Sequence, residues 1–166
     1  MIDELKNDTH AMVSFLQNTN DGTITYVLEK LGRLENGYSR EPLLNLLNNQ
    51  NENIRALSLK NLAKMSDISL LPIFVKYASK DESTEVRRES VSAIGRLRNE
   101  KAIPTLIKFL TDNDPKVVMQ AIRGLFVFAN KPDIKQELKK LLNHPNELIK
   151  EGWIQVSNST NLLKAS

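Results

Sequence analysis

Apolar and small residues return at helical spacing in four similar stretches of the chain, and a short polar segment precedes each one. In the stretch at 80–97 these positions are Val86, Ser90, Val91, Ile94 and Leu97. Positions i, i+4, i+5 and i+8 lie along one side of an α-helix. The preceding Asn and Asp residues suit a turn and a helix N-cap. The pattern therefore predicts one helix, termed helix B, in each of 49–65, 80–97, 111–128 and 143–159.

The four helix-B stretches repeat at a nearly constant interval. In our alignment Ile54, Val86, Val117 and Leu148 are equivalent, with separations of 32, 31 and 31 residues. A small residue follows each of them after four positions, at Ser58, Ser90, Ala121 and Gly152. A weaker fifth copy lies at 20–34. The alignment predicts that equivalent residues occupy equivalent places in consecutive layers.

A second helix, termed helix A, is predicted between successive B helices. The segments are 41–49, 70–79, 102–111 and 134–143. Pro42, Pro72 and Pro104 begin three of them, at spacings of 30 and 32 residues. Proline is tolerated in the first turn of a helix because that N–H has no acceptor within the helix. No segment alternates with a period of two, so no sheet is expected.

A helix pair of about 31 residues cannot bury its own apolar face, and stacked pairs share a continuous core. We therefore expect an all-α, right-handed, armadillo-like α-solenoid of about five helix pairs. It would form a single domain, 1–166, with repeats at approximately 2–38, 39–68, 69–100, 101–131 and 132–163. The pattern resembles HEAT repeats, in particular the short bacterial HEAT-like repeats of the phycobilisome-lyase type. Residues 81–95 and 112–125 carry the resemblance best, and 2–34 depart from it most.

The amino-acid composition excludes several kinds of site and a membrane span. The chain has no Cys, which excludes disulfides, thiolate catalysis and Cys-ligated metal sites. No apolar run approaches the roughly 18 residues of a membrane span, and the start of the chain is polar and acidic. We expect a cytoplasmic protein with no membrane partner. The chain could also be one part of a longer protein.

The reactive groups do not converge on a catalytic site in the sequence. His10 and His144 are the two histidines, and no nucleotide, metalloprotease or nucleophile-elbow motif occurs. Carboxylates in the turns, such as Asp81 and Asp112, are expected to cap helices. We therefore expect a protein that is not an enzyme, with no catalytic residue, metal, cofactor or small-molecule substrate. A lyase-type chaperone for a chromophore finds no supporting residues.

Basic residues concentrate on one side of the B helices. The resemblance to HEAT repeats implies that B helices line the concave face, and fifteen positions of the five copies would point outward there. Seven are basic and one, Glu29, is acidic, whereas Lys and Arg make up 23 of 166 residues, so about two would be basic by chance. The seven candidate binding residues are Arg33, Lys60, Lys64, Arg88, Arg96, Arg123 and Lys150.

Two functions compete for this face, and an ordinary solvated helix surface remains an alternative to both. The first is a scaffold that binds a protein partner. The second is a module that binds the backbone of duplex DNA, as part of a larger DNA-processing protein. Nearby acidic residues would weaken the positive field; they are Glu85, Glu89, Glu147 and Glu151.

Three further residues receive structural interpretations. Arg55 and Arg87 match an arginine of the HEAT pattern that bonds to a turn aspartate, so we expect them to pair with Asp81 or Asp114 and exclude them from binding. Trp153 is expected to close the last core layer, with a stacking platform for a base or a partner side chain as its alternative.

Overall fold

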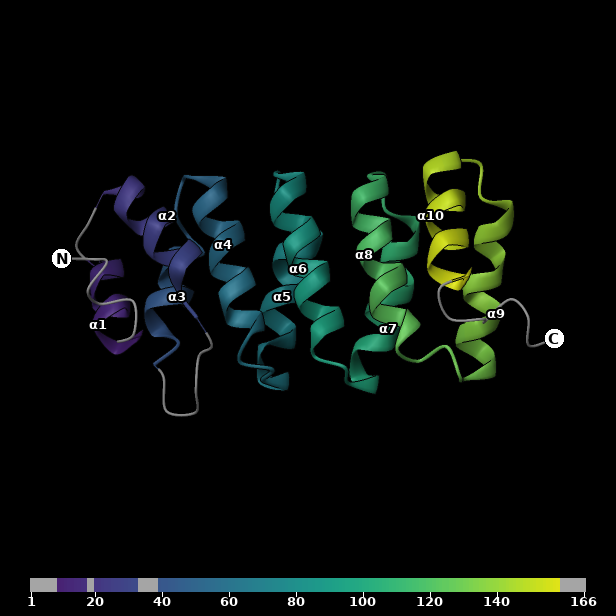
Figure 1. The fold of residues 1–166 in the computed structure, drawn as a ribbon, viewed down its shortest axis with the longest axis horizontal. Coiled ribbons are helices and arrows are strands. Elements are labelled where there is room, and N and C mark those ends of the chain that lie inside the picture. Colours follow the sequence, from purple (N-terminus) through teal and green to yellow (C-terminus); the bar gives the residue numbers. More distant parts are fainter. Residues whose placement is uncertain (1–8, 18–19, 33–38, 159–166) are drawn as a thin grey trace.

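The helix pairs stand side by side, with α1 at one end of the stack and α9 and α10 at the other (Figure 1). The computed structural model describes residues 9–17, 20–32 and 39–158. Every regular element within those residues is helical, as predicted. The helices pair in order along the chain: α3 packs on α4, α5 on α6 and α7 on α8. These are the predicted pairs of helix A and helix B.

The described residues contain ten α-helices and five short 3-10 helices. The α-helices are α1 (Thr9–Ser14), α2 (Asp21–Lys30), α3 (Glu41–Leu46), α4 (Glu52–Ala63), α5 (Leu71–Lys80), α6 (Thr84–Arg96), α7 (Ile103–Lys108), α8 (Pro115–Phe126), α9 (Pro132–Lys140) and α10 (Glu147–Asn158). The 3-10 helices are η2 (Phe15–Gln17), η3 (Ile68–Leu70), η4 (Glu100–Ala102), η5 (Phe109–Thr111) and η6 (Leu141–Asn143). Within this part of the chain, no helix has both the length and the apolar character that crossing a membrane requires.

The A helices begin where the prolines predicted. Pro42, Pro72 and Pro104 occupy the first or second position of α3, α5 and α7. Two of these helices are shorter than their predicted segments, because α3 ends at Leu46 and α7 gives way to η5 after Lys108. The proline signal therefore located the starts of these helices better than periodicity located their ends.

The B helices begin at a repeated turn. Asn51, Ser83, Asp114 and Asn146 each accept a hydrogen bond from a backbone N–H in the first turn of the helix that follows. Two residues before each of them, a further side chain accepts a hydrogen bond from the backbone N–H of the capping residue. These side chains are Asn49, Asp81, Asp112 and His144, at donor–acceptor distances of 2.8, 2.9, 2.9 and 3.1 Å. His144 thus supports the turn before α10 by accepting from the capping residue Asn146.

This capping series corrects the alignment of the last repeat. Counted from the caps, the residue equivalent to Ile54, Val86 and Val117 is Ile149, which is 2% exposed, whereas Leu148 is 67% exposed. The interval from Asp114 to Asn146 is 32 residues, and our alignment used 31. One residue corresponds to a rotation of about 100° around a helix, which is enough to move a side chain from the core to the surface.

The same shift changes the roles of two neighbouring residues. Trp153, and not Gly152, is the equivalent of Ser58, Ser90 and Ala121. The indole is 2% exposed and closes the last layer of the core, as expected. Its Nε1 has no hydrogen-bond partner among the described residues.

The B helices form the tighter of the two rows. α4 packs extensively on α6, and α6 on α8, whereas successive A helices make few contacts with each other. We term the row of B helices the inner row, which is the place that the resemblance to HEAT repeats implies for them.

One buried ion pair joins two consecutive repeats. Arg55 Nε and Nη2 donate to the two carboxylate oxygens of Asp81 at 2.9 and 2.8 Å, and both side chains are at most 10% exposed. The hydrogen bond to Asp81 raises the pKa of Arg55. Arg87 has no such partner among the described residues: its guanidinium donates to the backbone carbonyls of Asp81 and Glu82 and to the Thr84 hydroxyl. The expected pairing of Arg55 is confirmed, and that of Arg87 with an aspartate carboxylate is wrong.

Candidate functional site

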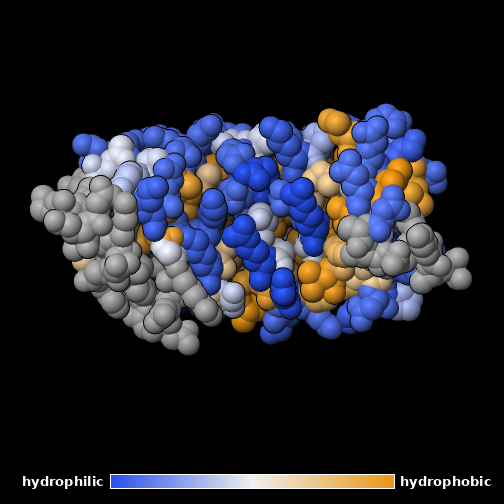
Figure 2. All heavy atoms as spheres, viewed as in Figure 1, coloured by the Kyte–Doolittle hydropathy of each residue, from blue (hydrophilic) through white to orange (hydrophobic). Residues whose placement is uncertain are grey.

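The inner row presents a polar surface at the centre of the molecule. Figure 2, drawn from the same side as Figure 1, shows hydrophilic side chains across the middle of the row, over α4, α6 and α8. We call the solvent-exposed surface of these three helices the B-helix face. Five of the seven basic residues predicted to bind a partner belong to these helices or to the residue that follows α4: Lys60, Lys64, Arg88, Arg96 and Arg123.

Three of these residues are exposed and available to a ligand. Lys60, Arg96 and Arg123 are exposed, and their side chains make no hydrogen bond or ion pair with any residue that the structure describes. They come from three consecutive B helices. Arg33, the predicted basic residue of the first repeat, lies outside the described residues.

Lys64 has a different role, because its ammonium group points back into the fold. Its Nζ donates hydrogen bonds to the Leu31 and Gly32 carbonyls, which follow α2, and to Asn61 Oδ1 at 2.7 Å. Burial, and then the positive charges of Lys60 and Arg96, lower the pKa of Lys64 below its ordinary value. Lys64 therefore fastens the end of α2 to α4.

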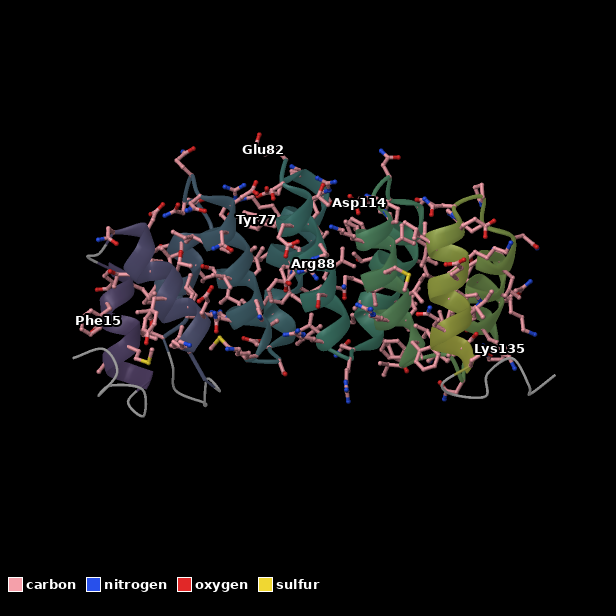
Figure 3. The ribbon with its side chains drawn as sticks, turned by 45° about the horizontal axis from the view of Figure 1, so that its top comes forward. Phe15, Tyr77, Glu82, Arg88, Asp114 and Lys135 are labelled. Carbon is pink, nitrogen blue, oxygen red and sulfur yellow. The ribbon has the colours of Figure 1, made fainter. Side chains whose placement is uncertain are left out.

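Arg88 lies on α6 near the middle of the row, but two carboxylates largely neutralise it (Figure 3). Its Nε donates to Glu85 Oε2 at 2.9 Å, and its Nη2 bonds to Glu85 Oε1 and to Glu89 Oε1. These bonds raise the pKa of Arg88, and the bond from Arg88 lowers that of Glu85. The dilution of the positive face by Glu85 and Glu89, expected from the sequence, is present.

Lys150 does not occupy the predicted place. Counted from the helix caps, it is equivalent to Arg55 and Arg87, and Glu151 takes the position that we had assigned to Lys150. Its Nζ lies 3.4 Å from Glu147 Oε1. The reason is the one-residue error in the alignment of the last repeat. The basic surface is therefore centred on α4, α6 and α8 and does not continue along α10.

Three arginines surround one hollow between α6 and α8. Arg96, Arg98 and Arg123 line a space of about 220 Å³, and its lining contains no acidic residue. Like Arg96 and Arg123, Arg98 is exposed and its side chain bonds to no described residue. We call this space the arginine hollow.

Sequence reasoning missed Arg98 because it lies beyond the end of α6, where helical spacing no longer places side chains. Its backbone has a φ of 47°, in the left-handed region that a non-glycine residue seldom adopts. Ser66, at the same distance from its cap, has a φ of 51°. The turn after helix B thus repeats in two layers, and in one of them it turns an arginine toward the hollow.

A second hollow continues from the first along the same two helices. It has a volume of about 420 Å³, and its lining residues are Glu85, Arg88, Lys116, Met119, Gln120 and Arg123. Gln120 and Arg123 line both hollows. Together the two hollows form one groove between α6 and α8, termed the α6/α8 groove, with an end rich in arginine and an end of mixed charge.

Two glycines form the floor of the arginine end. A Cβ atom built on Gly95 would lie 2.9 Å from the Cα of Gly124, so α6 and α8 meet backbone to backbone there. Both glycines also line the arginine hollow. Because neither has a side chain, the surface between the helices is hollowed, and the three arginines line the same hollow.

The groups needed for metal-dependent chemistry are not assembled in the described part of the chain. No three His, Cys, Asp or Glu side chains lie together there as a metal site would require. The groove offers hydrogen-bond donors, positive charge and a thioether. Such a set can bind and orient an anionic group.

A family model described as HEAT repeats matches residues 71–157, more than half of the chain. The protein belongs to the HEAT repeat family. The match covers α5 to α10 almost completely, and it includes both helices of the α6/α8 groove.

One relative found by sequence comparison is a subunit of a lyase. It is the phycocyanobilin lyase subunit beta of Nostoc sp. (strain PCC 7120), which is 28% identical over 108 residues; the match covers 58% of this chain and 54% of the relative. The chain therefore spans about half the length of the curated relative that it matches. The predicted resemblance to the phycobilisome-lyase type of repeat is confirmed.

Two solved structures share the fold. The complex of CpcE and CpcF of phycocyanin lyase from Nostoc sp. PCC7120 has a chain with a TM-score of 0.71 and 22% identity, covering 90% of this chain and 97% of that chain. A designed armadillo repeat protein in complex with the peptide (KR)4 has a TM-score of 0.61 and 20% identity, and the match covers 89% of this chain and 79% of that chain. These matches confirm the predicted right-handed α-solenoid of about five helix pairs.

The expectation that the protein is not an enzyme is contradicted by these relatives. The sequence relative is a lyase subunit, and the matching HEAT-like chain belongs to a lyase complex. The prediction depended on motifs for nucleophiles, metal ligands and phosphate loops within one chain. A subunit of an enzyme can contribute through binding and orientation, and those contributions leave no such motif.

Proposed function

We propose that this chain is a polypeptide-binding HEAT-repeat subunit of a lyase-type enzyme, and that it binds its protein partner on the B-helix face. The observation that carries the proposal is the α6/α8 groove with its exposed arginines at the centre of the inner row. Exposed charged groups that bond to no described neighbour can bond to a partner without first breaking internal contacts.

The relatives support this proposal at the level of the assembly. The phycocyanin lyase structure contains two different chains, CpcE and CpcF, in one complex. The designed armadillo protein, which has the same fold, was solved with a peptide. A chain that joins such an assembly needs a surface that recognises polypeptide, and the inner face of a solenoid provides an extended one.

Duplex DNA is the second candidate for the same face, and positive charge alone favours it. A protein that follows a phosphate backbone needs several cations, each of which neutralises a phosphate. In the structure Lys64 bonds to the end of α2, Arg88 pairs with two carboxylates and Lys150 lies off the face. Of the three that remain, Arg96 and Arg123 line the groove and Lys60 lies on α4, which favours a local polypeptide contact over a long duplex.

A peptide selection tests the proposal. We expect a random twelve-residue peptide library, panned against the full chain, to yield a shared motif. The selected peptides should protect backbone amides of α4, α6 and α8 from hydrogen exchange. A Ser92→Trp variant, which fills the groove from α6, should lose the selected peptides and keep its helicity.

Two results would contradict the proposal. One is protection that falls on α5 and α7 instead of the B helices. The other is tight binding of a 20-base-pair duplex at low salt, with a steep loss of affinity as salt rises and no peptide motif. That second result would assign the face to nucleic acid.

A separate experiment tests whether this chain binds the pigment of the related lyase. Phycocyanobilin is mixed with the protein, and its visible absorption spectrum is recorded. A changed spectrum that saturates at one equivalent would show that this chain contributes pigment binding to a lyase. An unchanged spectrum would limit its contribution to the binding of protein.

A further inference from the structure

The arginine hollow combines two features that a solvated helix surface does not need. Three arginines line one space, and no acidic residue lines it. Elsewhere on the same face, Arg88 has two carboxylate partners. Like charges gathered without a counter-charge repel one another, so this arrangement is most favourable when an anionic group is bound.

The backbone conformation of Arg98 also supports a binding role for this residue. Residues other than glycine that adopt a left-handed conformation are strained, and glycine is the usual residue at this position after a helix. Arg98 nevertheless adopts it, with a φ of 47°. Glycine at this position would relieve the strain and remove the guanidinium. The strained arginine is therefore understandable if its side chain has a binding role.

The volume of the hollow indicates which part of a ligand it can hold. A space of about 220 Å³ is smaller than the roughly 300–1,000 Å³ of pockets that enclose whole small molecules. It can hold the end of a side chain, such as a carboxylate, and arginine bonds to a carboxylate with two parallel N–H donors. The rest of the α6/α8 groove, which includes Met119, Gln120 and Lys116, can hold the adjoining residues of an extended chain.

We propose that the α6/α8 groove binds an acidic polypeptide segment, with one Asp or Glu carboxylate held between Arg96, Arg98 and Arg123. This inference rests on the proposed function and adds the chemical character of the partner. The charge of the hollow favours an acidic segment and disfavours a basic one such as (KR)4.

The binding experiment uses three fluorescein-labelled dodecapeptides and measures fluorescence anisotropy with the full chain. The first alternates Glu with Ser, the second has Gln in place of Glu, and the third alternates Lys with Ser. We expect only the Glu peptide to bind. Each two-donor contact between arginine and carboxylate is worth about tenfold in affinity.

Four variants locate the contact. Arg96→Ala, Arg98→Gly and Arg123→Ala should each weaken binding of the Glu peptide by about tenfold. Lys108→Ala is the control, because Lys108 is an exposed cation on α7, on the other row. It should change affinity by less than about twofold, as expected for a distant charge. Arg98→Gly should also raise the melting temperature, which separates lost binding from lost folding.

The outcomes separate this inference from the proposed function. If the Gln peptide binds as well as the Glu peptide and protects the B helices, the face binds polypeptide but the carboxylate proposal is wrong. If Lys108→Ala weakens binding as much as Arg123→Ala, the effect is one of general charge, and the hollow is not the site. If millimolar citrate or duplex DNA binds with the same arginine dependence and the Glu peptide does not, the occupant is not polypeptide.

Discussion

At the scale of single residues, the buried pair of Arg55 and Asp81 joins one repeat to the next. Arg55 also donates to the carbonyls of Asn49 and Gln50. Arg87, one layer further on, makes the same two kinds of carbonyl contact and bonds to no carboxylate in the part of the chain that the structure describes. The two arginines therefore differ mainly in the ion pair.

This difference predicts unequal losses of stability. Arg55→Ala should lower the free energy of unfolding by about 3 kcal/mol, because it leaves the buried Asp81 carboxylate without its counter-charge. Arg87→Ala should lower it by about 1 kcal/mol, the typical contribution of hydrogen bonds to carbonyls. Urea unfolding followed by circular dichroism at 222 nm measures both. Equal losses would show that the ion pair does not stabilise the contact between repeats.

The sequence predicted the residues of the B-helix face better than their individual roles. Helical spacing placed Lys60, Arg96 and Arg123 correctly on one surface. It could not show that Lys64 bonds to carbonyls after α2, because that contact depends on where a different helix ends. It also missed Arg98, whose position depends on a left-handed turn and not on a helix.

At the scale of elements, the contact between α6 and α8 shapes the groove. Gly95→Ala would place a methyl group 2.9 Å from the Cα of Gly124, and backbone cannot move aside as a side chain can. Gly152→Ala offers a control within another B helix, since its methyl would meet the flexible side chain of Met119, with Sδ at 2.5 Å.

We expect different effects on stability from these two substitutions. Alanine is preferred over glycine inside a helix by about 1 kcal/mol, so a substitution without a clash should stabilise the protein. Gly95→Ala should instead lower the free energy of unfolding by about 1–3 kcal/mol, the usual range for overpacking. Gly152→Ala should be close to neutral. Thermal and urea unfolding measure both, and a Gly95→Ala protein more stable than the parent would contradict the close helix contact.

The elements also show why the last repeat was misaligned. Apolar spacing alone fits Leu148 or Ile149, since the two are adjacent and both apolar. The capping residues decide between them, because Asn146 stands at the same place as Asn51, Ser83 and Asp114. Hydrogen-bonding residues at helix starts therefore fix the register of a repeat more firmly than its apolar positions do.

At the scale of the whole molecule, the layers of the stack differ in how extensively they pack on their neighbours. α10 packs less extensively on α8 than α6 does, and it exposes Leu148. In a repeat protein the stability of each layer depends on its neighbours, and the ends have fewer. The C-terminal layer should therefore open before the centre.

Trp153 reports on that layer because it is the only tryptophan of the chain and is buried in α10. We expect its fluorescence to change at a lower urea concentration than the circular dichroism at 222 nm, which averages over all helices. Superimposable transitions would show that the solenoid unfolds as one unit and that its last layer is as firmly held as its centre.

The most direct test of the account is a map of the surface that a bound peptide covers. Backbone amide chemical shifts of the ¹⁵N-labelled protein would be followed while the Glu peptide is added. The account predicts saturable shifts that cluster in α6, in α8 and in the turn at Arg98, and that disappear in the Arg123→Ala variant. Shifts confined to α5 and α7, or shifts that persist unchanged in that variant, would contradict it.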